Sequence, residues 1–596
     1  MQGASPRQHI AIIEAILPPE LICTIFKECA TSHEDLYYLR WTKLLLVCRR
    51  WHDIGVSTPK LWSFVECRFA AERAPHRIPN QDQLLRMVRR IDAQLLQAGT
   101  WPLTIMLDFP EHSICNDTHP KFAGLGQLDT MFGASRSLQS LTLRGNCDDV
   151  QWVMKNVTRN SHTQLQQLSV SVYPSKTLQS AVACPMPDHM PLLRTLQFMN
   201  HRPSLAFISD LRVLTLIMDE NPLSSIIIID DELLAVLARC PLLEALHLSD
   251  TGRTCQTLPT LSSGSLTFSH LTSLEITSAS ASSMAQALGF IDATHPSARV
   301  TLRIKSPLPP DAASMEALTI IQSWLIRHCV HPDAPIIHLL SIVFHSEGDA
   351  SVITRTDAGY RNSVTPSGNL VHTVDTRSGP AFAAFRCSRL KEHDYLTAFL
   401  EALPLQAVTH IDTRPNDILW EYQPLESECW RAIFAPGMLP SLTTLILPVS
   451  CHESQNNEHI SDVVSELRAC LDVGQRCPVG RIVLDLTMGQ DWVTDDGCHY
   501  CDTLSGRNCV SWKISRLFLS YLGDLCVEAK CQGTPLSVVE LINDDTWNML
   551  LDNYRTKIHS NLTVGLILNS ELYREPPKSH GLTLRQSRKL KRVPYR

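Results

Sequence analysis

Several features that mark a specialised class of protein are scarce in this chain of 596 residues. Its formal net charge is only −7, from 53 basic and 60 acidic side chains. No large field of one sign results, whereas a dedicated nucleic-acid binder normally carries a basic domain or stripe. The sequence therefore predicts no nucleic-acid partner.

Long apolar runs are also missing. The densest run, Ile226 to Ile229, is closed by Asp230. A membrane-spanning helix needs about 20 predominantly apolar residues, so we expect no membrane span. The first residues have no basic segment and carry Glu14 inside their apolar stretch, which is unlike a signal peptide.

The 20 cysteines are scattered without the spacing of a disulfide framework. Without a secretion signal, they indicate reduced thiols that pack as small apolar residues. We therefore expect the protein in the cytoplasm, the nucleus or both. Cys498 and Cys501, with Cys509, Cys526 and Cys531 further on, contain one Cys-x-x-Cys knuckle that could supply two zinc ligands. A matching second knuckle is lacking, so unligated thiols are favoured over a structural zinc site.

Catalytic signatures are not found either. The sequence has no Gly-x-Ser-x-Gly elbow, no His-Glu-x-x-His pair and no Gly-Lys-Ser/Thr phosphate loop. Gly124 and Gly126 lack the third glycine and the preceding strand of a dinucleotide site. A metalloenzyme around Cys498 is disfavoured because no general base accompanies it. We expect no enzyme activity, no cofactor and no metal.

Apolar residues at helical spacing are concentrated near the N-terminus. The segment Leu17 to Phe26 begins with two prolines that suit the first turn of a helix, and its apolar residues form one stripe. Ser32 and Asp35 form a capping box that predicts the start of a second helix, which contains Val47 to Trp51.

A third helical turn opens at Thr58–Pro59 and carries Leu61 and Trp62. Three short helices of about 50 residues have a marginal core when alone. The surplus apolar surface therefore needs a partner, either a second domain of this chain or another protein.

This order and spacing, over residues 13–68, resemble an F-box, the segment by which substrate receptors dock onto the Skp-type adaptor of cullin–RING ubiquitin ligases. One departure is Thr31 to Tyr38, which is longer than the usual turn between the first two helices. The resemblance implies that nine residues bury against the adaptor or brace that surface. They are Leu17, Pro18, Leu21, Ile22, Ile25, Val47, Trp51, Leu61 and Trp62.

Residues 80–98 predict a connecting helix that stops at Gly99, and the alternation in Leu103 to Phe109 predicts a strand. One pattern, Leu-x-x-Leu-x-Leu or a close variant, then recurs. Its copies begin at Leu138, Leu165, Leu193, Leu211, Leu243, Leu271 and, late in the chain, Leu442. In the first copy Asn146 stands where the strand is expected to leave the sheet.

These intervals resemble leucine-rich repeats, in which each unit contributes a strand and a returning helix or turn. The fold class expected is α/β: a three-helix F-box followed by an irregular leucine-rich-repeat-like solenoid with a parallel sheet. Stacked units would bury their leucines together and expose a concave sheet. The expected segments are 13–68 (F-box), 69–100 (connecting helix), 101–305 (repeats), 306–440 (irregular insertion with strands and a flexible loop), 441–570 (resumed repeats) and 571–596 (basic tail).

Outward positions of the expected strands are mostly small and polar, which suits a protein surface better than a deep small-molecule pocket. Arg144, His247 and Glu275 are the candidate target contacts among them, with ordinary solvation as the alternative. The sequence thus predicts a substrate receptor that joins the Skp-type adaptor and its ligase to a target protein. The alternative is a repeat scaffold outside any ligase, with the N-terminal helices as a cap.

Overall fold

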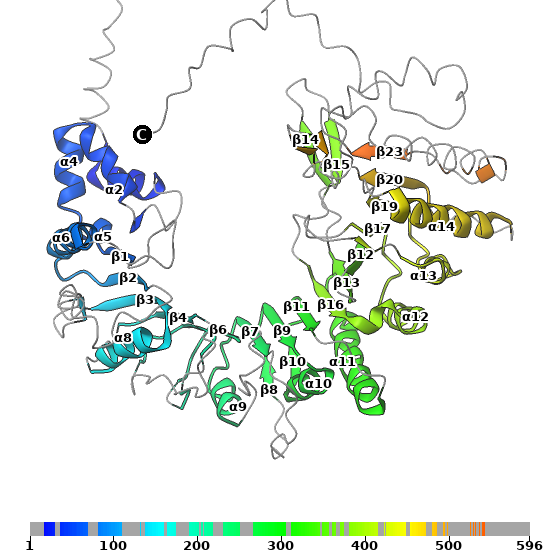
Figure 1. The fold of residues 1–596 in the computed structure, drawn as a ribbon, viewed down its shortest axis with the longest axis horizontal. Helices are drawn as coiled ribbons and strands as arrows, with labels where there is room; N and C mark the ends of the chain where they lie inside the picture. The colour runs from blue at the N-terminus through cyan, green and yellow to red at the C-terminus, as the bar shows by residue number, and fades with distance from the viewer. Residues whose placement is uncertain are drawn as a thin grey trace, which may run out of the picture. The chain divides into compact units, whose positions relative to one another are not determined.

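The computed structural model gives a mixed α/β protein in which most strands pair in parallel, as the sequence predicts at this level (Figure 1). The residues that the structure describes are 17–29, 36–37, 39–68, 81–109, 131–132, 137–159, 164–173, 190–201, 204–206, 208–218, 231–250, 266–305, 311–345, 349–356, 360–364, 370–374, 381–414, 422–423, 425–448, 453–472, 479–485, 493–494, 497–498, 525, 528–529, 531, 536 and 539–542. The basic C-terminal tail expected from the sequence lies outside them.

The chain divides into two compact units, Met1–Ala334 and Pro335–Arg596. The boundary falls inside the segment 306–440 that the sequence analysis assigns to an insertion. Helix α11 (Ala312–Val330), in the first part of that segment, packs on α10 (Ala281–Phe290) of the first unit. The two units are referred to below as unit 1 and unit 2.

The described part of unit 1 begins with short helices. They are α2 (Pro19–Glu28), the 3-10 helix η1 (Arg40–Leu46), α4 (Arg49–Val56) and α5 (Pro59–Trp62), and strand β1 (Phe64–Arg68) follows. Prolines start α2 and α5, where a missing N–H costs little. The second predicted helix is interrupted at two points, at Leu39, which has a left-handed φ of 55°, and at Cys48, which is extended. The predicted capping box at Ser32 and Asp35 lies outside the described residues.

The predicted connecting helix is confirmed as α6 (Gln81–Ala98). It ends at Gly99, whose φ of +58° favours glycine. The helix is fixed to β1 by two side-chain hydrogen bonds, from Arg90 Nη2 to the Glu66 carbonyl (2.7 Å) and from Gln94 Nε2 to the Phe64 carbonyl (2.8 Å). Helix α6 is therefore held against the first strand of the sheet.

Each leucine-patterned segment from residue 138 to residue 276 contains a strand, as predicted. The strands of the unit 1 sheet are β1, β2 (Leu103–Asp108), β3 (Leu138–Gly145), β4 (Gln167–Val172), β5 (Thr195–Met199), β6 (Val213–Ile217), β7 (Ala245–Asp250), β9 (Ser273–Ser278) and β11 (Arg299–Ile304). Each pairs in parallel with the next in this order. A separate parallel pair joins β8 (Leu266–Phe268) to β10 (Ile291–Thr294).

Register places the pattern leucines opposite one another. The second leucine of each copy forms a continuous row of Cα partners: Leu141, Leu168, Leu196, Leu214, Leu246 and Leu274. All six are buried. One strand could not bury its leucines alone, so the stacking of neighbours supplies the core.

Helices α8 (Cys147–Arg159), α9 (Asp231–Ala238) and α10 lie on one side of these strands (Figure 1). Asn146 follows β3 directly and caps α8, because its Oδ1 accepts a hydrogen bond from the Asp149 amide (3.0 Å). The strand residues that alternate with the buried leucines form the opposite side, which we call the open face.

Unit 2 combines antiparallel and parallel pairing. Strand β12 (Leu339–His345) pairs antiparallel with β13 (Ala350–Arg355), and β13 with β16 (Ala383–Cys387). On its other side β12 pairs in parallel with β17 (His410–Asp412), and β19 (Thr444–Pro448), β20 (Arg481–Asp485) and β23 (Val539–Ile542) follow in parallel. The strand predicted at Leu442 to Leu447 is thus confirmed as β19.

The remaining elements of unit 2 are short apart from one helix. They are the hairpins β14–β15 (Tyr360–Val364, Leu370–Val374) and β21–β22 (Val493–Thr494, Gly497–Cys498), β18 (Tyr422–Gln423), η2 (Ser388–Lys391), α12 (His393–Ala402), α13 (Ser427–Ile433) and α14 (Glu453–Asp472). From the sequence, Ser461 is expected to cap a helix that carries Val463, Val464 and Leu467, and this prediction is wrong. The helix starts at Glu453, and Ser461 lies inside it on the exposed side.

We expect the leucine rows to dominate the stability of unit 1. Leu196→Ala removes a fully buried side chain from the middle of the sheet, and it should lower the free energy of unfolding by about 3 kcal/mol. The adjacent Gln197→Ala on the open face should change it by less than about 0.5 kcal/mol. Hydrogen exchange of the β4 to β6 amides, measured in both variants, checks the difference; equal effects would contradict the assignment of the two faces.

Unit 2 should lose stability in mild acid through His410. Burial, aided by the charges of Arg481 and His338, lowers the pKa of His410 to about 4 from an ordinary 6.5. The folded state therefore favours neutral imidazole, so this contribution is complete above pH 6.5 and is lost as the pH falls towards 4. The free energy of unfolding, measured with urea, should fall between pH 7 and pH 5. This fall should be about 2 kcal/mol larger in the native chain than in a His410→Gln variant.

Candidate protein-binding surfaces

The N-terminal helical unit, defined as the described residues from 17 to 62, is built around one small core. Its buried side chains are Ile22, Phe26, Leu36, Trp41 and Leu61. The Phe26 ring packs edge-on against Trp51, with ring centroids 5.6 Å apart, and Trp41 packs in the same way on Trp62 at 5.0 Å. Aromatic residues therefore supply much of the area that holds α2, η1, α4 and α5 together.

Three polar contacts fix the same helices. The Trp62 Nε1 donates to the Gly55 carbonyl (2.9 Å), and Arg50 Nη2 donates to the Leu17 carbonyl (2.5 Å). Cys23 Sγ lies 3.3 Å from Thr58 Oγ1. These bonds tie α4 to α5, the start of α2 to α4, and α2 to the start of α5.

The nine residues expected to contact or brace an adaptor surface divide by exposure. Ile22 and Leu61 are buried in the core; Leu17, Ile25, Trp51 and Trp62 are half-buried; Pro18, Leu21 and Val47 are exposed. Only the exposed residues, and the exposed parts of the half-buried ones, can contact a partner directly. Ile22 and Leu61 instead hold the helices of this unit together.

Large apolar side chains of this unit face solvent. Leu21 is 50% exposed, Val47 53% and Leu46, at the end of η1, 86%. The sequence analysis did not single out Leu46, because it lies within the run Leu44 to Val47, and no periodicity shows which of the four is outward. Leu46 and Val47 are adjacent in the chain, and exposed apolar side chains next to one another are a mark of an interaction site.

The open face of unit 1 is ordered in rows of strand partners. One row contains Thr142, Ser169, Gln197, Thr215, His247 and Glu275, and the next contains Asp108, Arg144, Ser171, Met199, Ile217, Ser249 and Thr277. Most of these side chains are partly or fully exposed, but Ser249 and Thr277 are buried. The three candidate target contacts all lie on this face.

His247 and Glu275 are direct strand partners on β7 and β9. His247 Nε2 lies 3.4 Å from Glu275 Oε1, and both side chains are partly exposed. Arg144 lies at the end of β3, separated from this pair by β4, β5 and β6. The sequence-predicted contacts are thus brought to one face but not to one cluster.

Arg144 has its own surroundings. Its guanidinium carbon lies 5.3 Å from the centre of the Tyr173 ring, a cation–π contact. The Tyr173 hydroxyl donates to Asp108 Oδ1 (3.1 Å), and burial, with the Asp108 charge, raises the pKa of Tyr173. The phenol therefore stays protonated and anchors both neighbours. Tyr173 carries no signal in the sequence, because it lies just beyond β4 and outside the repeat pattern.

Met199 and Ile217 form an apolar pair in the middle of the open face. They are Cα partners on β5 and β6; Met199 is 38% exposed and Ile217 is half-buried. Asn200, with a φ of 58°, donates from its amide to the Ile217 carbonyl (2.7 Å) and from Nδ2 to the Val172 carbonyl (3.1 Å). The ends of β4, β5 and β6 are therefore joined beside this pair.

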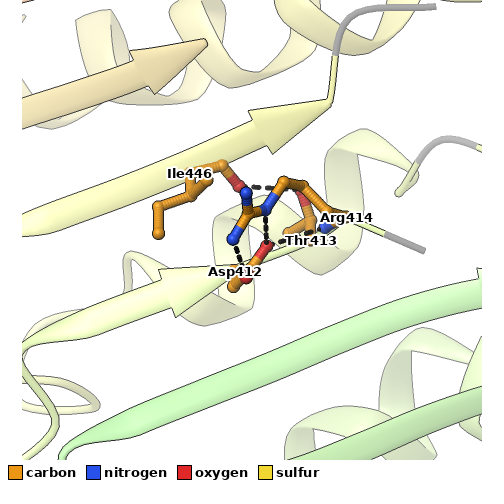
Figure 2. Close-up of polar contacts among 4 residues, drawn as sticks. All are labelled: Asp412, Thr413, Arg414 and Ile446. Atoms are coloured by element: carbon orange, nitrogen blue, oxygen red, sulfur yellow. Dashed lines mark hydrogen bonds and ion pairs between the residues drawn. The ribbon is translucent and has the colours of Figure 1, made fainter. Parts of the chain in front are cut away.

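Among the described residues of unit 2, the most buried ion pair lies at the end of β17 (Figure 2). Arg414 donates from Nε to Asp412 Oδ1 (2.9 Å) and from Nη2 to Oδ2 (2.8 Å), and both side chains are buried. Thr413 between them donates from its amide and from Oγ1 to the Ile446 carbonyl of β19 (3.1 and 3.2 Å). The bidentate pair therefore fixes the chain where β17 ends, and Thr413 ties this end to β19, which indicates a structural role.

Neither a metal site nor a membrane-spanning helix is found in the part of the chain that the structure describes. It contains no group of three or more His, Cys, Asp or Glu side chains arranged to hold a metal ion. Cys501, Cys509 and Cys526 of the expected thiol group lie outside the described residues, and Cys531 is exposed. None of the described helices has the length and apolar character needed to cross a bilayer.

Neither a scan of protein-family models nor a search of curated proteins finds a match for this chain.

We expect the Asp412–Arg414 pair to stabilise unit 2 strongly. Arg414→Met leaves a carboxylate buried without its bidentate partner, and should lower the free energy of unfolding by about 3 kcal/mol or more. The double variant Asp412→Leu/Arg414→Met removes both charges and should cost much less. Urea unfolding of the two variants checks this, and a double variant as unstable as the single one would contradict it.

Proposed function

We propose that this protein is a substrate receptor that joins a Skp-type adaptor of a cullin–RING ubiquitin ligase to a target protein. The N-terminal helical unit would be its F-box, and the parallel strands of unit 1 would be a degenerate leucine-rich-repeat solenoid. Catalysis would belong to the partner enzymes, and this chain would supply proximity between them and the target.

One observation carries the proposal: large apolar side chains are exposed on the N-terminal helical unit. Helix α2 packs on α4 and η1, whereas α6 packs on α5 and β1. Leu21 is consequently left facing solvent, although the alternative of a structural cap would have α2 pack onto the connecting helix. Val47, in the Val-Cys-Arg-Arg-Trp segment that resembles an F-box, is exposed in the same way.

The open face supports the other half of the proposal. Its strand partners are small and polar over most of the sheet, with Arg144, the His247–Glu275 pair and the Met199–Ile217 pair as the larger features. A broad surface of this kind suits a protein better than a small molecule. A repeat scaffold outside any ligase would use the same face. Binding to the adaptor therefore distinguishes the two functions.

Binding to a purified Skp-type adaptor, measured by calorimetry, tests the proposal. The native chain should bind, and Leu21→Ala/Val47→Ala should weaken binding by about thirtyfold or more, because truncation of an anchor commonly costs about 2 kcal/mol. Both side chains are exposed, so the variant should keep its fold, whereas a change at the buried Ile22 would damage the core.

The matched control is Leu85→Ala/Leu96→Ala, which removes two exposed leucines from α6. It should bind the adaptor like the native chain. A folded native chain that does not bind would contradict the ligase assignment and favour the scaffold. Equal losses in both double variants would show that the surface around Leu21 and Val47 is not the docking site.

A further inference from the structure

The row of the open face that contains Arg144 has a distinctive order of side chains. From β3 to β6 it runs from Arg144 through Ser171 to Met199 and Ile217. A cation, a small residue and two apolar side chains thus follow one another across four adjacent strands. This combination can recognise charge and apolar shape together.

Arg144 is suited to an external anion. It is exposed, and it forms no ion pair with any residue that the structure describes. The Tyr173 ring supports its guanidinium on one side, which restricts the side chain before a ligand arrives. Asp108, its strand partner on β2, accepts the Tyr173 hydroxyl. A carboxylate on a partner would therefore meet a positioned cation.

Met199 and Ile217 provide the apolar part. The hydrogen bonds of Asn200 to the neighbouring strand ends hold this part of the sheet. Ser171, whose side chain is small, lies between Arg144 and Met199 in this row. A partner element can therefore lie across the strands and touch both ends of the row.

The spacing of Arg144, Met199 and Ile217 indicates which kind of secondary structure in a partner can contact all three. Neighbouring strands lie about 4.8 Å apart, so Met199 lies roughly 10 Å and Ile217 roughly 14 Å from Arg144. A helix rises 1.5 Å per residue, so about seven and ten or eleven residues cover these distances, and these positions share a helix face. An extended segment would reach them with about its third and fourth residues, which point to opposite sides.

We propose that the open face binds an amphipathic helix of the target protein, with an acidic residue on Arg144 and aliphatic residues about seven and eleven positions away on Met199 and Ile217. The inference rests on the proposed function in so far as the helix belongs to a target. It adds the chemistry of the partner: one helix face with a carboxylate at one end and an apolar pair at the other.

Selection from a displayed library tests it. The probe is an alanine-rich helical peptide of about 20 residues, randomised at positions i, i+7 and i+11 and selected on the full native chain. Asp or Glu should be enriched at one end of the pattern and Leu, Ile or Met at the two others. On an Arg144→Glu chain, Lys or Arg should replace the acidic residue.

Matched variants locate the site. Met199→Lys should weaken the selected peptides by about tenfold or more. Met315→Lys, at a methionine of α11 with the same 38% exposure, should leave their affinity unchanged. The inference is overturned if no peptide is enriched, or if the native and Arg144→Glu chains select the same residue. It is also overturned if Met199→Lys instead dissociates a dimer of this chain, since the occupant would then be a second copy.

Adaptor binding, measured on the same chains, separates this inference from the proposed function. If the native chain binds the adaptor but selects no patterned peptide, the proposed helix specificity is wrong and the ligase assignment stands. A chain that selects the pattern but does not bind the adaptor supports the helix specificity and contradicts the ligase assignment.

Discussion

The structure of unit 1 depends on the register of its leucine rows. A single strand such as β5 cannot bury Leu196 and Phe198 by itself, so it is stable only between β4 and β6. The same register that aligns the buried leucines also aligns the residues between them. The order of side chains on the open face, from Asp108 to Thr277, is therefore a consequence of core packing.

In the N-terminal helical unit, by contrast, the core is too small to cover the apolar side chains around it. Its core is small and depends on aromatic rings, with Trp41 and Phe26 buried among the helices. So few residues cannot cover every apolar side chain, and Leu46 and Val47 remain exposed. Such surface costs solubility unless a partner covers it, which is why it carries more functional information here than the core.

Sequence alone predicted what depends on periodicity and missed what depends on tertiary packing. The Leu-x-x-Leu-x-Leu copies located every strand from β3 to β7, because burial imposes a repeat on the sequence. The start of α14 was misplaced at Ser461, since a polar run from Glu453 hides the first turns. Leu46 and Ile217 were missed because their exposure is decided by neighbours far along the chain.

The connection between the two surfaces matters for the proposed function. Helix α6 donates hydrogen bonds to β1, and the buried Glu66 of that strand accepts from Arg68 Nε at 2.5 Å. Strand β1 in turn pairs with β2 over its whole length. Helix α5 of the helical unit packs on both α6 and β1, so the helical unit is joined to the sheet by packed structure rather than by a free linker. A receptor that acts only by proximity gains from this, because a fixed connection restricts where the bound target can lie, whereas a flexible linker dilutes its effective concentration.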